Sequence, residues 1–203
     1  FGSRTAMELK GIACVTLEPH EEKRKNCCVS RSFGKKVTKL EDLSEAITTH
    51  CLNAAEKIRS DEQTVKKITV FIRTSPFLNK KNYYANSKSA DLAIKTNDSI
   101  ELIKQALNIL KNIYRKGYRY QKAGIILSGL EDINTYDKNL FSAIGNEKKR
   151  EKLMKAIDHA NARYGRHSLS VAQAGLKKIW SSKRQHYSKI DTASFRLLPT
   201  VRI

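Results

Sequence analysis

The sequence predicts an α+β domain in which two helices cover one face of a four-stranded antiparallel sheet. One observation is that segments of period-two alternation exchange with segments of helical periodicity between residues 27 and 131. A second is their order along the chain: strand, helix, strand, strand, helix, strand. With 203 residues, 40% of them hydrophobic, the chain has enough apolar side chains for one medium-sized core with additional segments at its ends.

The first strand is predicted over residues 27–37. Ser30 and Ser32 would point to one face, while Arg31 and Phe33 would point to the other. Hydroxyl groups and guanidinium groups are usual partners of phosphates. An ordinary half-buried edge strand has the same pattern, and the pattern leaves open which of its faces would meet a ligand.

Both helices have recognisable starts. Thr38 with Glu41 matches a capping box, and the apolar stripe that follows predicts a helix that ends near Arg59. Asp98 with Glu101 predicts the start of the second helix, because acidic side chains accept the unpaired N–H groups of a first turn.

The other three strands follow from alternation and composition. From residue 65, apolar side chains alternate with Lys67, Thr69 and Arg73, so one face of this strand is expected to be basic. Shorter strands are predicted over residues 89–95 and 123–127, and the last is apolar enough to be central. The complete order is that of the ferredoxin-like split βαββαβ arrangement, whose second sheet face stays open.

Three further segments flank the predicted domain. Residues 1–26 are interpreted as a tether from a missing domain, although a disordered tail would have the same composition. Residues 132–146 are interpreted as a linker, and residues 147–203 as a mainly helical extension. In that extension we predict a helix over residues 146–164, with Leu153, Ile157, Ala160 and Tyr164 on its packed side, and a strand over 168–172.

The excess of basic residues is the clearest indication of the class of partner. Lys and Arg outnumber Asp and Glu by 39 to 20, which favours a polyanion. No apolar run of about 18 residues exists, so we expect a cytoplasmic protein without a membrane span. The four cysteines and five histidines have no metal-ligand spacing, and no phosphate-binding glycine loop or catalytic serine motif is present.

Several blocks of sequence resemble one family. They are residues 4–14, 30–34, 54–59, 71–77 and 118–124. Together they are similar to the C-terminal half of the UmuC family, the catalytic subunits of bacterial DNA polymerase V and Y-family translesion enzymes. The resemblance extends from about residue 4 to the end.

The resemblance implies that residues 27–131 are the little-finger domain, which contacts the backbones of primer-template DNA during SOS mutagenesis. The catalytic palm with its Mg²⁺ ions would lie upstream, so this fragment would bind DNA without polymerising it and would need no cofactor. The expected DNA contacts, from the resemblance and from the basic strand together, are Ser30, Arg31, Ser32, Lys67, Thr69, Arg73, Thr74, Arg119 and Tyr120.

The same resemblance implies protein partners. The family's linker holds a sliding-clamp motif of the form Gln-Leu-x-Leu-Phe, and here Asn139, Leu140 and Phe141 match its last part while the Gln and the first Leu are replaced. The extension resembles the family's C-terminal part, which implies contacts with the UmuD′ dimer and the RecA filament.

Two other functions fit the sequence less well. RNA-recognition modules share this order of elements, but they stack bases on aromatic side chains of their central strands, and Phe71 alone is a poor platform. A pure interaction scaffold would bind no nucleic acid at moderate salt.

Overall fold

The computed structural model describes most of the chain. The described residues are 2–14, 23–77, 82–133, 147–176, 178, 180 and 181. The predicted clamp-binding residues Asn139, Leu140 and Phe141 lie outside them.

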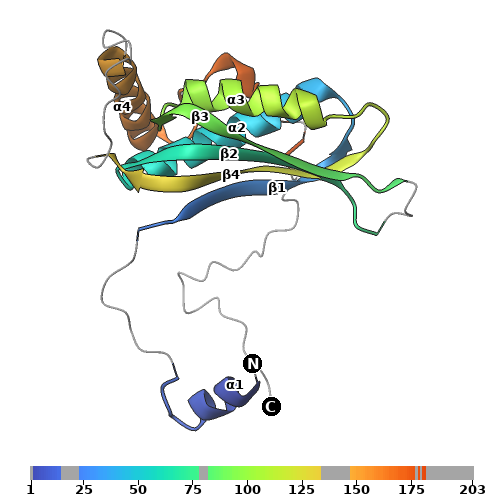
Figure 1. Cartoon of the computed structure of the whole chain (residues 1–203), viewed down its shortest axis with the longest axis vertical. Coiled ribbons are helices and arrows are strands. Elements are labelled where there is room, and N and C mark those ends of the chain that lie inside the picture. The colour runs from blue at the N-terminus through green and yellow to red at the C-terminus, as the bar shows by residue number, and fades with distance from the viewer. Residues whose placement is uncertain are drawn as a thin grey trace, which may run out of the picture.

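The predicted order of elements is confirmed (Figure 1). The strands are β1 (Asn26–Val37), β2 (Gln63–Thr74), β3 (Ala85–Thr96) and β4 (Tyr120–Asp132). The helices are α1 (Gly2–Leu9), α2 (Leu40–Ser60), α3 (Ser99–Ile113) and α4 (Glu147–Tyr164), and a 3₁₀ turn, η3, covers Ala172–Ala174. Helix α1, within the predicted tether, has no buried residue.

The four strands form one antiparallel sheet in the order β1-β4-β2-β3. Strand β4 therefore lies between β1 and β2, the two strands that α2 connects. Strand β2 likewise lies between β3 and β4, the two strands that α3 connects. Strand β4 is central, as predicted, and β2 is its central neighbour. The usual ferredoxin-like sheet has its first and third strands in the centre, so this sheet shares the order along the chain but not the order across the sheet.

Strands β3 and β4 are longer than predicted, at 12 and 13 residues. Residues 85–88 of β3 are exposed and three of the four are polar, so hydrophobic alternation does not mark them as strand. Their pairing with β2, from Ala85 opposite Arg73 onward, holds them in the sheet.

Helices α2 and α3 cover one face of the sheet (Figure 1). Helix α3 begins as predicted, because the Asp98 side chain accepts a hydrogen bond from the Ile100 amide at 2.8 Å. The predicted capping box of α2 is wrong: its N-cap is Lys39, one residue after Thr38, and makes no side-chain hydrogen bond. Glu41 and Asp42 in the first turn instead stabilise the helix dipole.

The core lies between these helices and the sheet. Ile68, Val70 and Ile72 of β2 face the helices and are at most 1% exposed. Ala123, Ile125 and Leu127 of β4 lie beside them and are fully buried. Alternation along the two central strands thus assigns every second side chain to the core.

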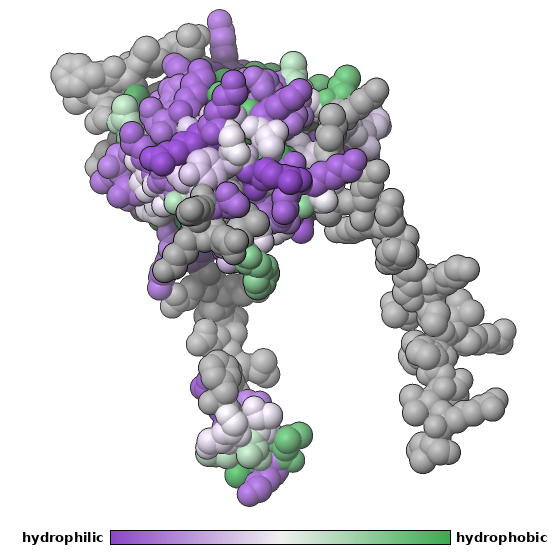
Figure 2. Space-filling model, turned by 90° about the vertical axis from the view of Figure 1, so that its right-hand side faces the viewer, coloured by the Kyte–Doolittle hydropathy of each residue, from purple (hydrophilic) through white to green (hydrophobic). Residues whose placement is uncertain are grey.

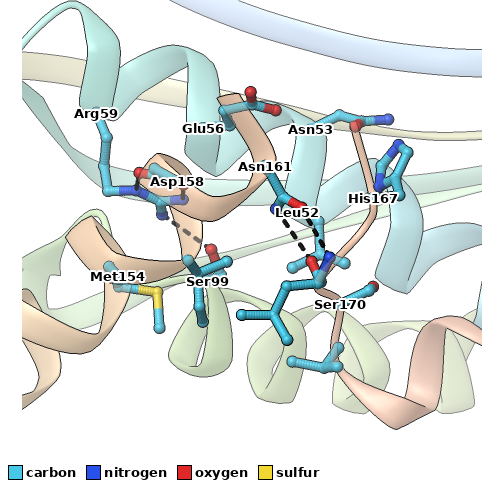
Figure 3. A pocket seen from close by; sticks show the side chains of 13 residues that line it. Leu52, Asn53, Glu56, Arg59, Ser99, Met154, Asp158, Asn161, His167 and Ser170 are labelled. Carbon is cyan, nitrogen blue, oxygen red and sulfur yellow. Dashed lines mark hydrogen bonds and ion pairs between the residues drawn. The ribbon is translucent and has the colours of Figure 1, made fainter. Parts of the chain in front are cut away.

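Helix α4 packs against the same layer, mainly through polar contacts. Arg59 of α2 donates to both carboxylate oxygens of Asp158, at 2.6 and 2.7 Å, and also to Ser99 at 2.8 Å (Figure 3). The buried apolar residue of α4 is Met154, at 3% exposure. The predicted packed side is therefore right for Ile157 and Ala160, which are half-buried, and wrong for Leu153 and Tyr164, which are 46% and 70% exposed.

The chain after α4 forms a loop rather than the strand predicted over residues 168–172. The Asn161 side chain bonds both backbone groups of Leu169, at 2.9 and 3.0 Å, so these groups do not pair with a strand (Figure 3). The loop then continues to Trp180, which is 6% exposed and belongs to the core cluster. Its ring lies 6.1 Å from that of Phe33 and 5.8 Å from that of His50.

Candidate nucleic-acid interface

The sheet face opposite α2 and α3 is the candidate interface. On β2 this face carries Lys67, Thr69, Phe71 and Arg73, which alternate with the buried apolar residues. Pairing brings further hydroxyl groups beside them: Ser30 and Ser32 on β1, Ser128 on β4, and Ser87 and Ser89 on β3. We call this the open face.

One row across the open face concentrates positive charge. Lys122 of β4 pairs with Ser32 of β1 on one side and with Arg73 of β2 on the other. Like charges at directly opposite positions destabilise a sheet. Neither cation forms an ion pair with a described residue. The row therefore has unneutralised positive charge that an anion can compensate.

The other end of the open face is closer to neutral. Lys67 lies 3.7 Å from the Asp91 carboxylate of β3. Thr69 and Ser89 share a hydrogen bond of 2.8 Å between their hydroxyl oxygens. Unpaired positive charge on the open face is thus concentrated at the end that holds Arg73 and Lys122.

The aromatic ring of Phe71 covers the middle of the open face. A Cβ atom built on Gly124 would lie 2.4 Å from the Cβ of Ser30 and 2.5 Å from Cζ of Phe71. The Phe71 ring therefore lies directly over Gly124 and is half-buried. It fills the space above a glycine and is not free to act as a platform for a stacked base.

Positive charge continues beyond the sheet at the Arg73 end. Exposed cations there come from the end of β1 and from the turn between α3 and β4; they are Lys35, Lys36, Lys39, Arg115, Lys116 and Arg119. Figure 2 shows this end of the molecule, and its surface is mostly hydrophilic. Arg115 also lies over the Tyr84 ring, 5.0 Å from its centroid.

The structure brings together five of the nine residues predicted to contact DNA. Ser30, Ser32, Lys67, Thr69 and Arg73 all lie on the open face. Arg119 lies in the exposed turn at its cationic end.

Three predicted contact residues lie elsewhere. Adjacent residues of a strand point to opposite faces, so Thr74 turns inward beside Arg73 and is fully buried. Tyr120 is also fully buried, and its hydroxyl bonds the Arg115 backbone amide and carbonyl, each at 2.9 Å. We therefore remove both from the proposed contacts. Arg31 is exposed, but it lies on the helix side of β1 with Phe33.

The sequence interpretation missed Lys122. The predicted strand begins at residue 123, and residues 119–122 are interpreted only as the segment that leads into it. The signal that would have found it is the alternation of residues 122–128, in which Lys122 shares the parity of Ser128 and opposes that of the buried Ala123 and Ile125.

The described residues hold no group of three or more His, Cys, Asp or Glu side chains able to bind a metal ion. Among the same residues, no helix has the length and hydropathy needed to span a membrane. The open face offers cations and hydroxyl groups that can bind an anion.

Fold and site together define an α+β domain of the split βαββαβ class with one packed face and one open, cationic face. Residues 24–140 match the family described as the impB/mucB/samB family C-terminal domain. The chain belongs to this family. Residues 151–201 match a domain of unknown function, DUF4113.

Relatives match over nearly the whole chain. Protein UmuC of Salmonella typhimurium is 36% identical over 199 residues, and protein ImpB of the same species is 34% identical over 200. Protein MucB of Escherichia coli is 36% identical over 200 residues. Each alignment covers 98% of this chain and 47% of the UmuC and ImpB sequences, so the chain spans about half the length of these relatives.

Proposed function

We propose that the open face binds the sugar-phosphate backbone of primer-template DNA. The observation that carries this proposal is the pair of neighbouring cations, Arg73 and Lys122, on adjacent strands without an anionic partner among the described residues. Phosphates neutralise such a pair, and the serine hydroxyl groups around it supply hydrogen bonds to phosphate oxygens.

Binding of this kind is indifferent to base sequence. Asn and Gln side chains, which pair bidentately with adenine edges, are absent from the residues that form the described part of the open face, apart from Asn26 at its margin. Contacts to the backbone position a protein on DNA but carry no sequence information. A surface that grips any template suits an enzyme that must copy damaged DNA.

Membership of the impB/mucB/samB family supports a wider proposal for the whole protein. We propose that it is a Y-family translesion DNA polymerase active in SOS mutagenesis, with the catalytic Mg²⁺ held by a palm domain outside this chain. We further propose the UmuD′ dimer, the RecA filament and the sliding clamp as its protein partners. The resemblance to UmuC supports these partners, and residues 137–141, which include Leu140 and Phe141, are the proposed clamp contact.

The DNA proposal is tested by the salt dependence of binding to a blunt duplex. With about four phosphates neutralised, the slope of log K against log salt is expected near −3.6, from about −0.9 per phosphate. The double variant Arg73→Ala/Lys122→Ala removes two of these contacts, so its slope should fall to about −1.8. Fluorescence anisotropy of a labelled duplex measures both.

A matched control removes two positive charges from the helix side of the domain. Lys104 and Lys111 are exposed on α3, and Lys104→Ala/Lys111→Ala should leave the slope close to that of the wild type. Equal slopes for the two double variants would contradict the proposal, because bulk charge alone would then explain binding. Tighter binding of single-stranded RNA than of duplex DNA in competition would favour the RNA-binding alternative.

A further inference from the structure

A second cationic site lies on the helix side of β1. There an open cleft of about 790 Å³ is bounded by β1, by α2 and by the loop that follows α4. Its volume falls in the range of pockets that bind small organic groups, about 300–1,000 Å³. Four cations line it, one or two from each boundary: Arg31, Lys57, Arg166 and Lys178.

The described residues do not balance the positive charge in this cleft. Glu56 is the one carboxylate among the lining residues. None of the four cations forms an ion pair or hydrogen bond within the part of the chain that the structure describes.

The cleft wall also contains polar atoms without partners. Nε2 of His50 and Nε1 of Trp180 are buried and accept or donate no hydrogen bond within the described chain. Burial, together with Arg31 and Lys178, lowers the pKa of His50 to about 4. Burial, and then Lys178 and Arg166 against the opposing effect of Glu56, also lower the pKa of His167. The cations that line the cleft thus add to the effect of burial on both imidazoles.

The cleft is continuous with the open face around a single strand. Ser32 lies on the open face in the row with Lys122, and it also lines the cleft. Strand β1 is an edge strand, so only its own width, about 5 Å, separates the two surfaces. A duplex, whose persistence length is about 150 base pairs, cannot bend around that edge, whereas a single strand can.

We propose that this cleft binds single-stranded nucleic acid that continues from the duplex on the open face. Arg31, Lys57, Arg166 and Lys178 contact its phosphates. This inference rests on the proposed function, because the open face supplies the duplex from which the strand extends. In this proposal Arg31, which the sequence predicts as a DNA contact, binds DNA in the cleft and not on the open face.

The test compares a blunt duplex with duplexes that carry a single-stranded extension of eight nucleotides at either the 5′ or the 3′ end. For the wild type, one of these extensions should tighten binding by about tenfold, the gain expected from two or three additional phosphate contacts. Trp180 is the single tryptophan of the chain and lines the cleft, so its fluorescence should change with that extension and not with the blunt duplex.

Two double variants separate this site from the open face. Arg31→Ala/Lys57→Ala should abolish the tenfold gain and the fluorescence change but keep the affinity for the blunt duplex. Arg73→Ala/Lys122→Ala should weaken binding of the blunt duplex. Lys104→Ala/Lys111→Ala serves again as the control of equal charge.

The outcomes distinguish the two proposals. No binding of the blunt duplex would contradict the proposed function, whereas binding without a gain from either extension would overturn the cleft proposal alone. A gain that survives Arg31→Ala/Lys57→Ala would also overturn it. So would displacement of the extension by poly-glutamate of equal charge as efficiently as by single-stranded DNA, since the cleft would then be a site for acidic polypeptides.

Discussion

The two faces of the sheet are built from the same strands but differ in what they can do. On the helix side, Ile68, Val70 and Ile72 are in contact with the core, and on the open side Lys67, Thr69 and Arg73 alternate with them. Stability and recognition are therefore encoded by residues of opposite parity in one strand. Substitutions on one face should change folding, and those on the other should change binding.

The edge strand β1 departs from this simple division. Its helix side carries Phe33 in the core but also Arg31 in the cleft, because α2 covers only part of the strand. The loop that ends in Trp180 closes the remainder of that side, where the Gly34 amide donates to the Trp180 carbonyl at 3.1 Å. The helix side thus depends on the segment that matches the domain of unknown function.

The largest effect is expected for Trp180→Ala. The ring packs against Phe33 and His50, and replacing a buried tryptophan by alanine costs about 3–5 kcal/mol of unfolding free energy. Urea unfolding followed by far-UV circular dichroism measures it. Leu176→Ala, at a fully exposed position of the same loop, should leave stability unchanged. Equal effects of the two variants would mean that the loop does not contribute to the core.

A smaller loss of stability is expected at acidic pH. His50 is 1% exposed, and its pKa is lowered from 6.5 to about 4, first by burial and then by Arg31 and Lys178. The unfolded chain therefore binds a proton that the folded domain excludes between these pH values. The contribution of His50 to the free energy of unfolding should be fully present above pH 6.5. It should fall as the pH decreases, by about 2 kcal/mol at pH 5.

The control for the acid effect is a pair of histidine variants. His50→Gln should flatten the decrease between pH 7 and pH 5, whereas His159→Gln, at an exposed position of α4, should leave it in place. An identical pH profile for the wild type and His50→Gln would show that the His50 imidazole is not excluded from protonation by folding.

Much of the fold could be predicted because periodicity is a local property. The alternation at residues 67–73 and the Asp98 cap each depend on neighbours in sequence, and both predictions are confirmed. The docking of α4 could not be predicted in this way. It depends on Arg59 and Asp158, whose pairing across 99 positions leaves no periodic signal.

The candidate site was predicted in part, for a similar reason. Parity correctly groups Lys67, Thr69 and Arg73, and it would also have excluded the buried Thr74. It could not have excluded Tyr120, which has the parity of Lys122 but is buried beyond the register shift next to Arg73. Lys122 was missed because the start of β4 is polar. The cleft was not foreseen, since its cations come from three segments that meet only in the folded chain.

The central claim is that DNA lies on the open face, and lysine acetylation in the presence of a blunt duplex tests it most directly. Lys67 and Lys122 lie on the open face, while Lys104 and Lys111 lie on α3, so one experiment reports on both sides. Our account predicts that the duplex slows acetylation of Lys67 and Lys122 several-fold and leaves Lys104 and Lys111 unchanged. Protection of the α3 lysines, or equal protection of all four, would contradict it.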